Sequence, residues 1–259
     1  MSTPLLHYKD EIFLKLESFN STGSVKDRAA AQMIAKAEKN KTLITADWGA
    51  FSLSCACVCK SMGRNLECFL PKDAEEIFTR QIKALDCKIH FCKKNPRKNA
   101  LEYLMENGEK CYFLDHSTDP EAPMSYCENL AEEIWTQTDG KVSAIVSGTE
   151  TCACLMGTAT GLKIKNPAVL SVAGIIDKDF YGNCDPLGNS EPEFYIPQLS
   201  DFLIYSSLED ACKKQEELFA ERGIECGIIG GACILAAERL RKEISGEIAV
   251  IIPSRYKTF

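Results

Sequence analysis

With 259 residues, of which 45% are hydrophobic and 26% charged, the chain is long enough to bury a core in one domain or in two lobes. Its net charge of −7 argues against nucleic acid as a partner, because binding phosphates needs a basic surface. No apolar run approaches the roughly 20 residues of a membrane span, and residues 1–4 do not begin a secretory signal, so we expect a cytoplasmic protein without membrane contacts.

The predicted elements alternate between strand and helix with short connections. A strand over 12–17 leads through a turn at 20–23 to an alanine-rich helix over 29–39. Such alternation predicts an α/β fold in which helices cover both faces of a parallel sheet. Segment 177–198, rich in glycine, proline and asparagine, is predicted to be an irregular loop. Further strands are predicted at 42–45, 67–70, 88–91, 144–146, 169–172 and 248–251, and further helices from Phe51, Ala74, Asn99, Tyr126, Cys154, Leu208 and Gly231.

Lys26 lies in the first turn of the first predicted helix. The positive end of the helix dipole disfavours an ammonium there and so favours the neutral amine, the form that attacks a carbonyl carbon. The alternative is a solvated lysine beside a helix cap, with Ser24 as the capping residue.

Segment 14–28, which reads LKLESFNSTGSVKDR, resembles the lysine motif of the cysteine synthase family. These are pyridoxal-phosphate (PLP) enzymes of fold type II, the tryptophan synthase β-like fold. The chain is identified as a divergent and shortened member. The resemblance continues through Thr-Pro-Leu at 3–5 and through residues 69–72, 146–167, 227–232 and 251–256.

The resemblance implies two lobes of parallel sheets covered by helices, with the cofactor in the cleft between them. We expect an N-terminal lobe over residues 1–125 and a C-terminal lobe over 126–259, with approximate boundaries and exchanged segments. It also implies that Lys26 forms the Schiff base with PLP and then acts as the base on the substrate α-carbon. The implied cofactor-binding residues are Lys26, Ala50, Gly148, Thr149, Glu150, Thr151, Cys152, Ala153, Cys154 and Ser254.

The phosphate loop departs from the family pattern. The family carries Gly-Thr-Gly-Gly-Thr where this chain has Glu-Thr-Cys-Ala-Cys at 150–154. Glycines allow successive N–H groups to surround a phosphate. A Glu150 carboxylate about 5 Å from a phosphate would cost about 3 kcal/mol per unit charge at an effective dielectric near 20. We therefore expect weakened or lost affinity for PLP. Ser254 is implied to face the pyridine nitrogen; the alternative is an ordinary hydroxyl at a strand end.

The substrate loop departs further. The family's Thr-Ser-Gly-Asn-Thr corresponds here to Asp47, Trp48, Gly49, Ala50 and Phe51. Ala50 replaces the asparagine that contacts the cofactor ring oxygen, and the residues that hold an amino-acid carboxylate are lost. An aspartate repels a carboxylate and would instead attract an amino group or water.

Fourteen cysteines are many for a cytosolic chain, and most lie inside apolar patterns, where a thiol packs as a small hydrophobe. Cys55, Cys57 and Cys59 do not share one helix face, so we expect no metal site. Cys152 and Cys154 lie at a helix start, which favours a reactive thiol, although the neighbouring Glu150 opposes thiolate formation.

Two functions follow from the resemblance. The first is a PLP-dependent lyase or transferase that acts on a small amino acid by β-elimination or β-replacement, with altered substrate specificity. The second is a catalytically degenerate homologue that acts as a binding or regulatory protein and takes a protein or peptide partner in the cleft. Family members are commonly homodimers, and we expect the same here. A third hypothesis is a thiol-based sensor at residues 152–154.

Overall fold

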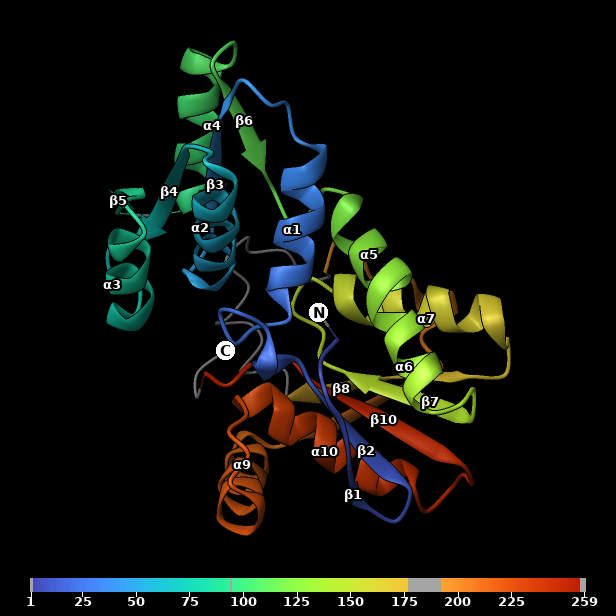
Figure 1. Cartoon of the computed structure of the whole chain (residues 1–259). Coiled ribbons are helices and arrows are strands. Elements are labelled where there is room, and N and C mark those ends of the chain that lie inside the picture. Colours follow the sequence, from blue (N-terminus) through green and yellow to red (C-terminus); the bar gives the residue numbers. More distant parts are fainter. Residues whose placement is uncertain (1, 94, 177–191, 257–259) are drawn as a thin grey trace. The chain divides into compact units, whose positions relative to one another are not determined.

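The computed structural model describes residues 2–93, 95–176 and 192–256, which divide into two compact units (Figure 1). Among the described residues, the first unit contains 2–25, 123–176 and 192–256, and the second contains the residues between 26 and 122. Residues 177–191 of the predicted irregular loop lie outside the described part of the chain. The rest of that loop contains turns and the start of a short 3₁₀ helix, η3 (Pro197–Leu199).

The first unit is built on a six-stranded sheet with the strand order β1-β2-β10-β7-β8-β9. All neighbouring strands are parallel except the edge strand β1, which runs antiparallel to β2. Five of the six residues of the central strand β10 are buried, as expected where helices cover both faces. The strands are β1 (Leu5–Lys9), β2 (Ile12–Leu16), β7 (Val142–Ser147), β8 (Leu170–Ile176), β9 (Phe202–Ser206) and β10 (Glu247–Ile252).

Helices pack on both faces of this sheet (Figure 1). Helices α9 and α10 join an apolar core that contains Leu218 and Ile234 beside Leu14 and Val250 of the sheet. Helices α6 and α7 pack on the other face. The helices are α5 (Glu121–Ser125), the π-helix η2 (Tyr126–Leu130), α6 (Ala131–Gln137), α7 (Ala153–Lys165), α9 (Leu208–Arg222) and α10 (Ile228–Leu240), and the 3₁₀ helix η1 (Glu17–Phe19) follows β2.

The second unit is a four-stranded parallel sheet with the order β5-β4-β3-β6. Successive side chains of β3 point to opposite faces of the sheet. Ile44 packs with Ala100 of α4, and the Thr45 hydroxyl forms a hydrogen bond with the Ser52 hydroxyl of α2. Its strands are β3 (Thr42–Ala46), β4 (Leu66–Pro71), β5 (Lys88–Cys92) and β6 (Cys111–Leu114), and its helices are α1 (Lys26–Lys36), α2 (Ala50–Met62), α3 (Glu76–Ala84) and α4 (Pro96–Asn107).

The buried ammonium of Lys15 in strand β2 forms hydrogen bonds with two side chains of helix α6. The side chain of Lys15 is fully buried, and its Nζ donates to the Glu133 carboxylate at 2.6 Å. It also donates to the Gln137 side-chain oxygen at 2.8 Å and to the Thr3 carbonyl at 2.7 Å. The three donors of the ammonium therefore each have an acceptor, and one of these acceptors carries the opposite charge.

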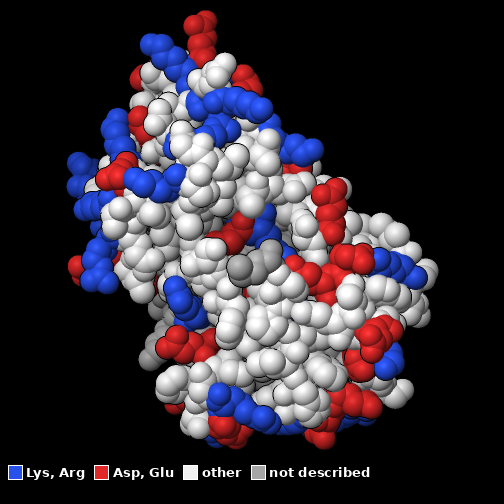
Figure 2. Space-filling model, in the orientation of Figure 1, with Lys and Arg blue, Asp and Glu red and all other residues white. Residues whose placement is uncertain are grey.

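The expected α/β fold with parallel sheets is confirmed, while some details of the elements differ from the prediction. Helix α1 begins at Lys26, which was expected in its first turn, but ends at Lys36 rather than at residue 39, and α10 begins at Ile228 rather than at 231. Strands β1, β6 and β9 were not predicted, and each lies at the edge of its sheet. Within the described residues, no helix combines the length and apolar character needed to cross a membrane. On the face drawn in Figure 2, acidic and basic side chains are mixed.

Candidate functional site

Lys26 is the first residue of α1, as the sequence predicts. The preceding segment pairs with the end of the chain beyond β10. Ser24 forms an antiparallel bridge with Ser254, and the Val25 N–H donates to the Pro253 carbonyl at 2.7 Å. Both serines are buried. The fold thus fixes Ser254 beside a residue that precedes Lys26 by only two positions.

The turn before the lysine is also fixed by the chain end. Gly23 has φ +82°, and a Cβ there would collide with the Arg255 guanidinium. The backbone N–H of Arg255 donates to the Gly23 carbonyl at 3.1 Å, and the Tyr256 hydroxyl donates to the Thr22 carbonyl. Only glycine meets both the backbone conformation and the close approach at this turn.

The predicted phosphate loop connects β7 to α7. Gly148 has no room for a side chain, because a Cβ would collide with Ile229 of α10. Cys152 is buried and precedes α7 with a left-handed backbone, φ +60°. Its Sγ donates to the Thr149 carbonyl at 3.4 Å, while Glu150 is exposed. A left-handed residue before a helix is the backbone form that lets successive N–H groups point at an anion, although glycine adopts it with less strain.

The rest of the loop forms the helix start. The Ala153 N–H donates to Thr151 Oγ1 at 3.3 Å, and Cys154 lies in the first turn of α7. Burial, with the nearby Cys154 adding to it, raises the pKa of the Cys152 thiol to about 12. A thiol with so high a pKa carries little thiolate at neutral pH, which argues against a reactive cysteine here.

The other buried thiols behave in the same way. Burial raises the pKa of Cys59 and Cys226 to about 12 each, and it also raises the pKa of Cys55. Such thiols pack as small hydrophobic groups. In the part of the chain that the structure describes, no group of three or more His, Cys, Asp or Glu side chains is arranged to hold a metal ion.

The segment predicted to be the substrate loop follows β3, and its aspartate caps α2. Asp47 Oδ2 accepts the N–H of Phe51 at 2.8 Å and that of Ser52 at 3.3 Å. Its Oδ1 accepts the Ser52 hydroxyl, which shares a further hydrogen bond of 2.7 Å with Thr45 Oγ1. Asp47 is only 8% exposed. Its carboxylate is therefore bound within the chain, where it satisfies N–H groups that a helix start leaves without partners.

The other residues of this loop, 48–51, carry no hydroxyl or amide side chain that could bind a carboxylate, and two of them are aromatic. Phe51 is buried and stacks on His116, with 4.4 Å between the ring centroids. Gly49 has φ +125°, and a Cβ there would lie 2.7 Å from Cβ of Phe78. Trp48 is 47% exposed, and Ala50 begins α2 with a methyl group that forms no hydrogen bond.

Sequence reasoning did not identify the residues after β6, because that strand was not predicted. Asp115 follows β6 and pairs with Arg97 at 2.7 Å. Its other oxygen accepts the Ser117 hydroxyl at 2.6 Å. Burial alone would raise the pKa of the Asp115 carboxyl, but the hydrogen bonds from Ser117 and Arg97 outweigh it and hold the pKa below its usual value. The Asp-His-Ser triplet at 115–117 was the available signal in the sequence.

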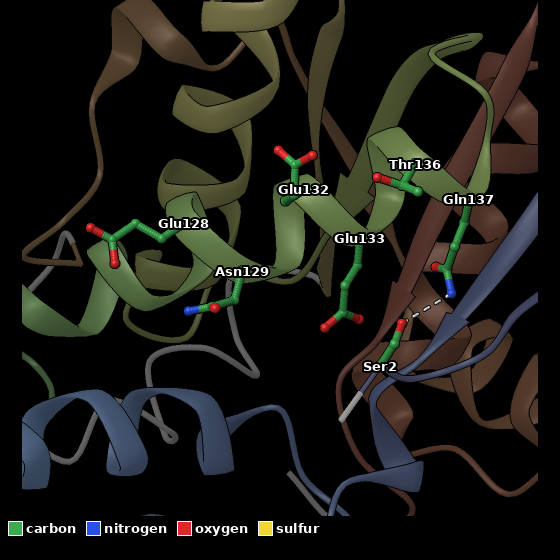
Figure 3. A pocket seen from close by; sticks show the side chains of 7 residues that line it. All are labelled: Ser2, Glu128, Asn129, Glu132, Glu133, Thr136 and Gln137. Atoms are coloured by element: carbon green, nitrogen blue, oxygen red, sulfur yellow. Dashed lines mark hydrogen bonds between the residues drawn. The ribbon is translucent and has the colours of Figure 1, made fainter.

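A separate hollow of about 300 Å³ lies in the first unit and contains none of the predicted site residues (Figure 3). Two of its glutamates are already paired, Glu133 with the buried Lys15 and Glu132 with Lys165 at 2.5 Å. Its lining residues are Ser2, Glu128, Asn129, Glu132, Glu133, Thr136 and Gln137.

Comparison with known proteins gives consistent matches along the chain. A family model described as "Pyridoxal-phosphate dependent enzyme" matches residues 2–254. The cysteine synthase of Aquifex aeolicus (strain VF5) is 30% identical over 259 aligned positions, which cover 93% of this chain and 79% of that protein.

Solved structures match over almost the whole chain. O-acetyl serine sulfhydrylase isoform 3 from Entamoeba histolytica superposes with a TM-score of 0.89 at 21% identity and covers 98% of this chain and 86% of its own. A hydrogen sulfide-producing enzyme from Fusobacterium nucleatum has a TM-score of 0.87 at 25% identity, with coverage of 99% and 96%.

Proposed function

Because this chain belongs to the family of pyridoxal-phosphate dependent enzymes, we propose that it is a lyase or transferase of the cysteine synthase type. It acts on a small amino acid by β-elimination or β-replacement, with altered substrate specificity. The observation that carries this proposal is the intact Ser-Val-Lys-Asp-Arg segment, which ends a fixed turn and places Lys26 as the first residue of α1.

The expected tryptophan synthase β-like fold is confirmed by the solved structures that the chain resembles. The residues present also fit pyridoxal phosphate. Lys26 supplies the primary amine that binds the cofactor aldehyde. Cys152 has a left-handed backbone, and Gly148 has no side chain to cover the loop, so the backbone has a form that can bind a phosphate. The exposed position of Glu150 leaves its carboxylate in contact with solvent, which weakens its repulsion of a phosphate.

Each residue of the proposed site has a separate role. Bound pyridoxal phosphate supplies the electron sink that stabilises negative charge at the substrate α-carbon. Lys26 would hold the cofactor and would take the proton from that carbon. The N–H groups of the loop over 148–154 would hold the phosphate, and the Ser254 hydroxyl would serve the pyridine nitrogen. Ala50 offers no hydrogen bond to the ring oxygen, so we expect weaker cofactor binding than in relatives with asparagine.

Titration of the purified chain with pyridoxal phosphate tests this function. We expect a saturable visible absorbance, which Lys26→Ala abolishes because it removes the amine. The matched control is Lys36→Ala, which removes an exposed lysine from the last turn of the same helix and should leave the absorbance unchanged. A wild-type spectrum identical to that of Lys26→Ala would refute the proposal.

A second function is favoured by one observation: the Asp47 carboxylate is bound to the start of α2, where it opposes an incoming carboxylate. In this alternative the chain is a catalytically degenerate homologue that binds a protein or peptide partner and regulates it. Co-purification of one stoichiometric partner, with no Lys26-dependent turnover of serine, cysteine or O-acetylserine, would support it. Turnover that Lys26→Ala abolishes would exclude it. We propose a homodimer in both cases, which light scattering would test.

A further inference from the structure

Four cysteines of the second unit lie around helix α2, which packs against α3 and β4 (Figure 1). Cys55 and Cys59 are one turn apart on α2, so they share a helix face, and both are fully buried. Cys68 of β4 is also fully buried and lies beside the Ser52 side chain of α2. Cys87 directly precedes β5 and is partly exposed. The proposed cofactor site uses none of these four thiols.

The fold brings two of these thiols, those of Cys59 and Cys87, close to each other. The residues next to them form an ion pair, in which Lys60 Nζ lies 2.5 Å from Asp86 Oδ2. Lys60 directly follows Cys59, and Asp86 directly precedes Cys87. Burial raises the pKa of the Cys59 thiol to about 12, and the nearby Cys87 thiol adds to that rise. The end of α2 and the start of β5 therefore carry neighbouring thiols from separate parts of the sequence.

Backbone hydrogen bonds fix the position of both cysteines. The Arg64 N–H donates to the Cys59 carbonyl at 2.9 Å, beyond the end of α2. The Cys87 N–H donates to the Ile82 carbonyl at 3.3 Å, beyond the end of α3. A disulfide tolerates little error in the spacing of its two Cα atoms. A link that forms in the folded chain would thus test these fixed positions directly.

The two thiols differ in their access to solvent. Cys59 is fully buried, whereas Cys87 is partly exposed, so an oxidant in solution meets Cys87 first. Burial raises the pKa of the Cys87 thiol, and the Lys60 ammonium acts in the opposite direction. A thiol open to an oxidant beside a second, buried thiol is the arrangement in which oxidation of the first is followed by a disulfide.

We propose that Cys59 and Cys87 are a redox pair that hydrogen peroxide converts into an intramolecular disulfide. The Cys87 thiolate attacks one peroxide oxygen and the O–O bond breaks, which gives a sulfenic acid and a hydroxide that takes up the former thiol proton. The Cys59 sulfur then attacks the Cys87 sulfur, and the hydroxyl group leaves as water with the Cys59 proton. The two thiols are oxidised by two electrons, and the peroxide is reduced to two water molecules.

The disulfide is reversible, because two molecules of a small thiol reduce it by exchange and are themselves joined as a disulfide. This inference goes beyond the proposed function and does not depend on it. Neither cysteine belongs to the proposed cofactor site, so absence of cofactor uptake would leave the redox pair intact.

Peptide mapping of the folded full chain tests the pair. The chain is treated with hydrogen peroxide, its remaining thiols are alkylated under denaturing conditions, and a tryptic digest is analysed by mass spectrometry without reductant. Cleavage after lysine and arginine places Cys59 in peptide 42–60, Cys68 in 65–72 and Cys87 in 84–88. We expect a link between 42–60 and 84–88 that dithiothreitol removes. A Cys87 that remains without a link, or a link from 84–88 to 65–72, would overturn the inference.

Variants assign the link within peptide 42–60, which also contains Cys55 and Cys57. Cys59→Ser and Cys87→Ser should each abolish it. The matched control is Cys57→Ser, which removes a partly buried thiol from a different side of α2 and should keep the link. In Cys59→Ser the sulfenic acid of Cys87 has lost its partner, so dimedone should capture it, with little capture in wild type. A link that persists in Cys59→Ser would contradict the pairing.

Two further measurements keep the test decisive if a serine variant does not fold. Cys59→Ala removes the thiol without leaving a buried hydroxyl, and fragmentation of the linked wild-type peptides identifies the cysteine that carries the bond. The urea-unfolded chain is a control for the role of the fold, because the same treatment should there link Cys87 to several cysteines. The same single link in the unfolded chain would mean that the fold does not select Cys59, and would refute the inference.

Discussion

Removal of the Glu133 carboxylate should destabilise the first unit strongly, because it leaves a buried ammonium without its counter-charge. Lys15 is fully buried, and Glu133 Oε2 lies 2.6 Å from its Nζ. Breaking a buried ion pair from one side costs about 3–5 kcal/mol. The Glu133 side chain retains 17% exposure, and the Gln137 oxygen still accepts from the ammonium at 2.8 Å. We therefore expect Glu133→Ala to cost about 3 kcal/mol, the lower end of that range.

The reverse change should cost less. Lys15→Met removes the buried charge and leaves a partly hydrated Glu133, with two neutral acceptors that lose a donor, so we expect about 1–3 kcal/mol. The double variant with Glu133→Gln should be more stable than the sum of the single effects predicts, by about 2 kcal/mol, since the two groups are in contact.

Urea denaturation followed by circular dichroism measures these free energies. The matched control is Glu132→Ala, which breaks the surface pair with Lys165 from the adjacent position and should cost less than about 1 kcal/mol. A Glu133→Ala cost equal to that of the control, or additive behaviour of the double variant, would refute the account of this ion pair.

Three further results are expected. Hydrogen bonds, including that from Arg97, hold the pKa of Asp115 below its usual 3.8 despite burial, so its stabilisation is complete above pH 3.8 and is lost as pH falls through the lower folded value. Asp115→Asn should flatten that part of a plot of unfolding free energy against pH, and an unchanged slope would count against this. Because the pKa of Cys152 rises from 9.0 to about 12, iodoacetamide at pH 8 should modify it about 1,000-fold more slowly in the folded than in the urea-unfolded chain, as peptide mass spectrometry would show. Gly49→Ala combines left-handed strain with a collision and should cost more than Gly63→Ala, which meets only the strain of about 1–2 kcal/mol. Equal midpoints of unfolding for these two variants would contradict the collision.

Central strands were predictable from the sequence, whereas among the edge strands only β5 was predicted and β1, β6 and β9 were not. The buried strands β3, β4, β7, β8 and β10 show continuous apolar runs, because both of their faces are covered. Strands β1 and β9 are largely exposed, and β6 has only four residues, so their apolar signal is weak. The orientation of β1 depends on its turn into β2 rather than on its composition.

For the candidate site too, the features that depend on local sequence were predictable, and the contacts between distant residues were not. The position of Lys26 at a helix start follows from the strand, turn and helix around it, all of which are local features. The binding of Asp47 to the start of α2 could not be predicted, because it depends on how the chain turns between β3 and the helix. Likewise, the pairing of Ser24 with Ser254 joins positions that are 230 residues apart in the sequence.

The most direct test of the central claim is to identify the residue that takes up the cofactor. The chain is incubated with pyridoxal phosphate, reduced with borohydride, digested and analysed by peptide mass spectrometry. The expected result is a stoichiometric cofactor adduct on Lys26 that competing excess free lysine does not prevent. An adduct spread over exposed lysines, or an unmodified Lys26, would contradict the claim that this amine holds the cofactor.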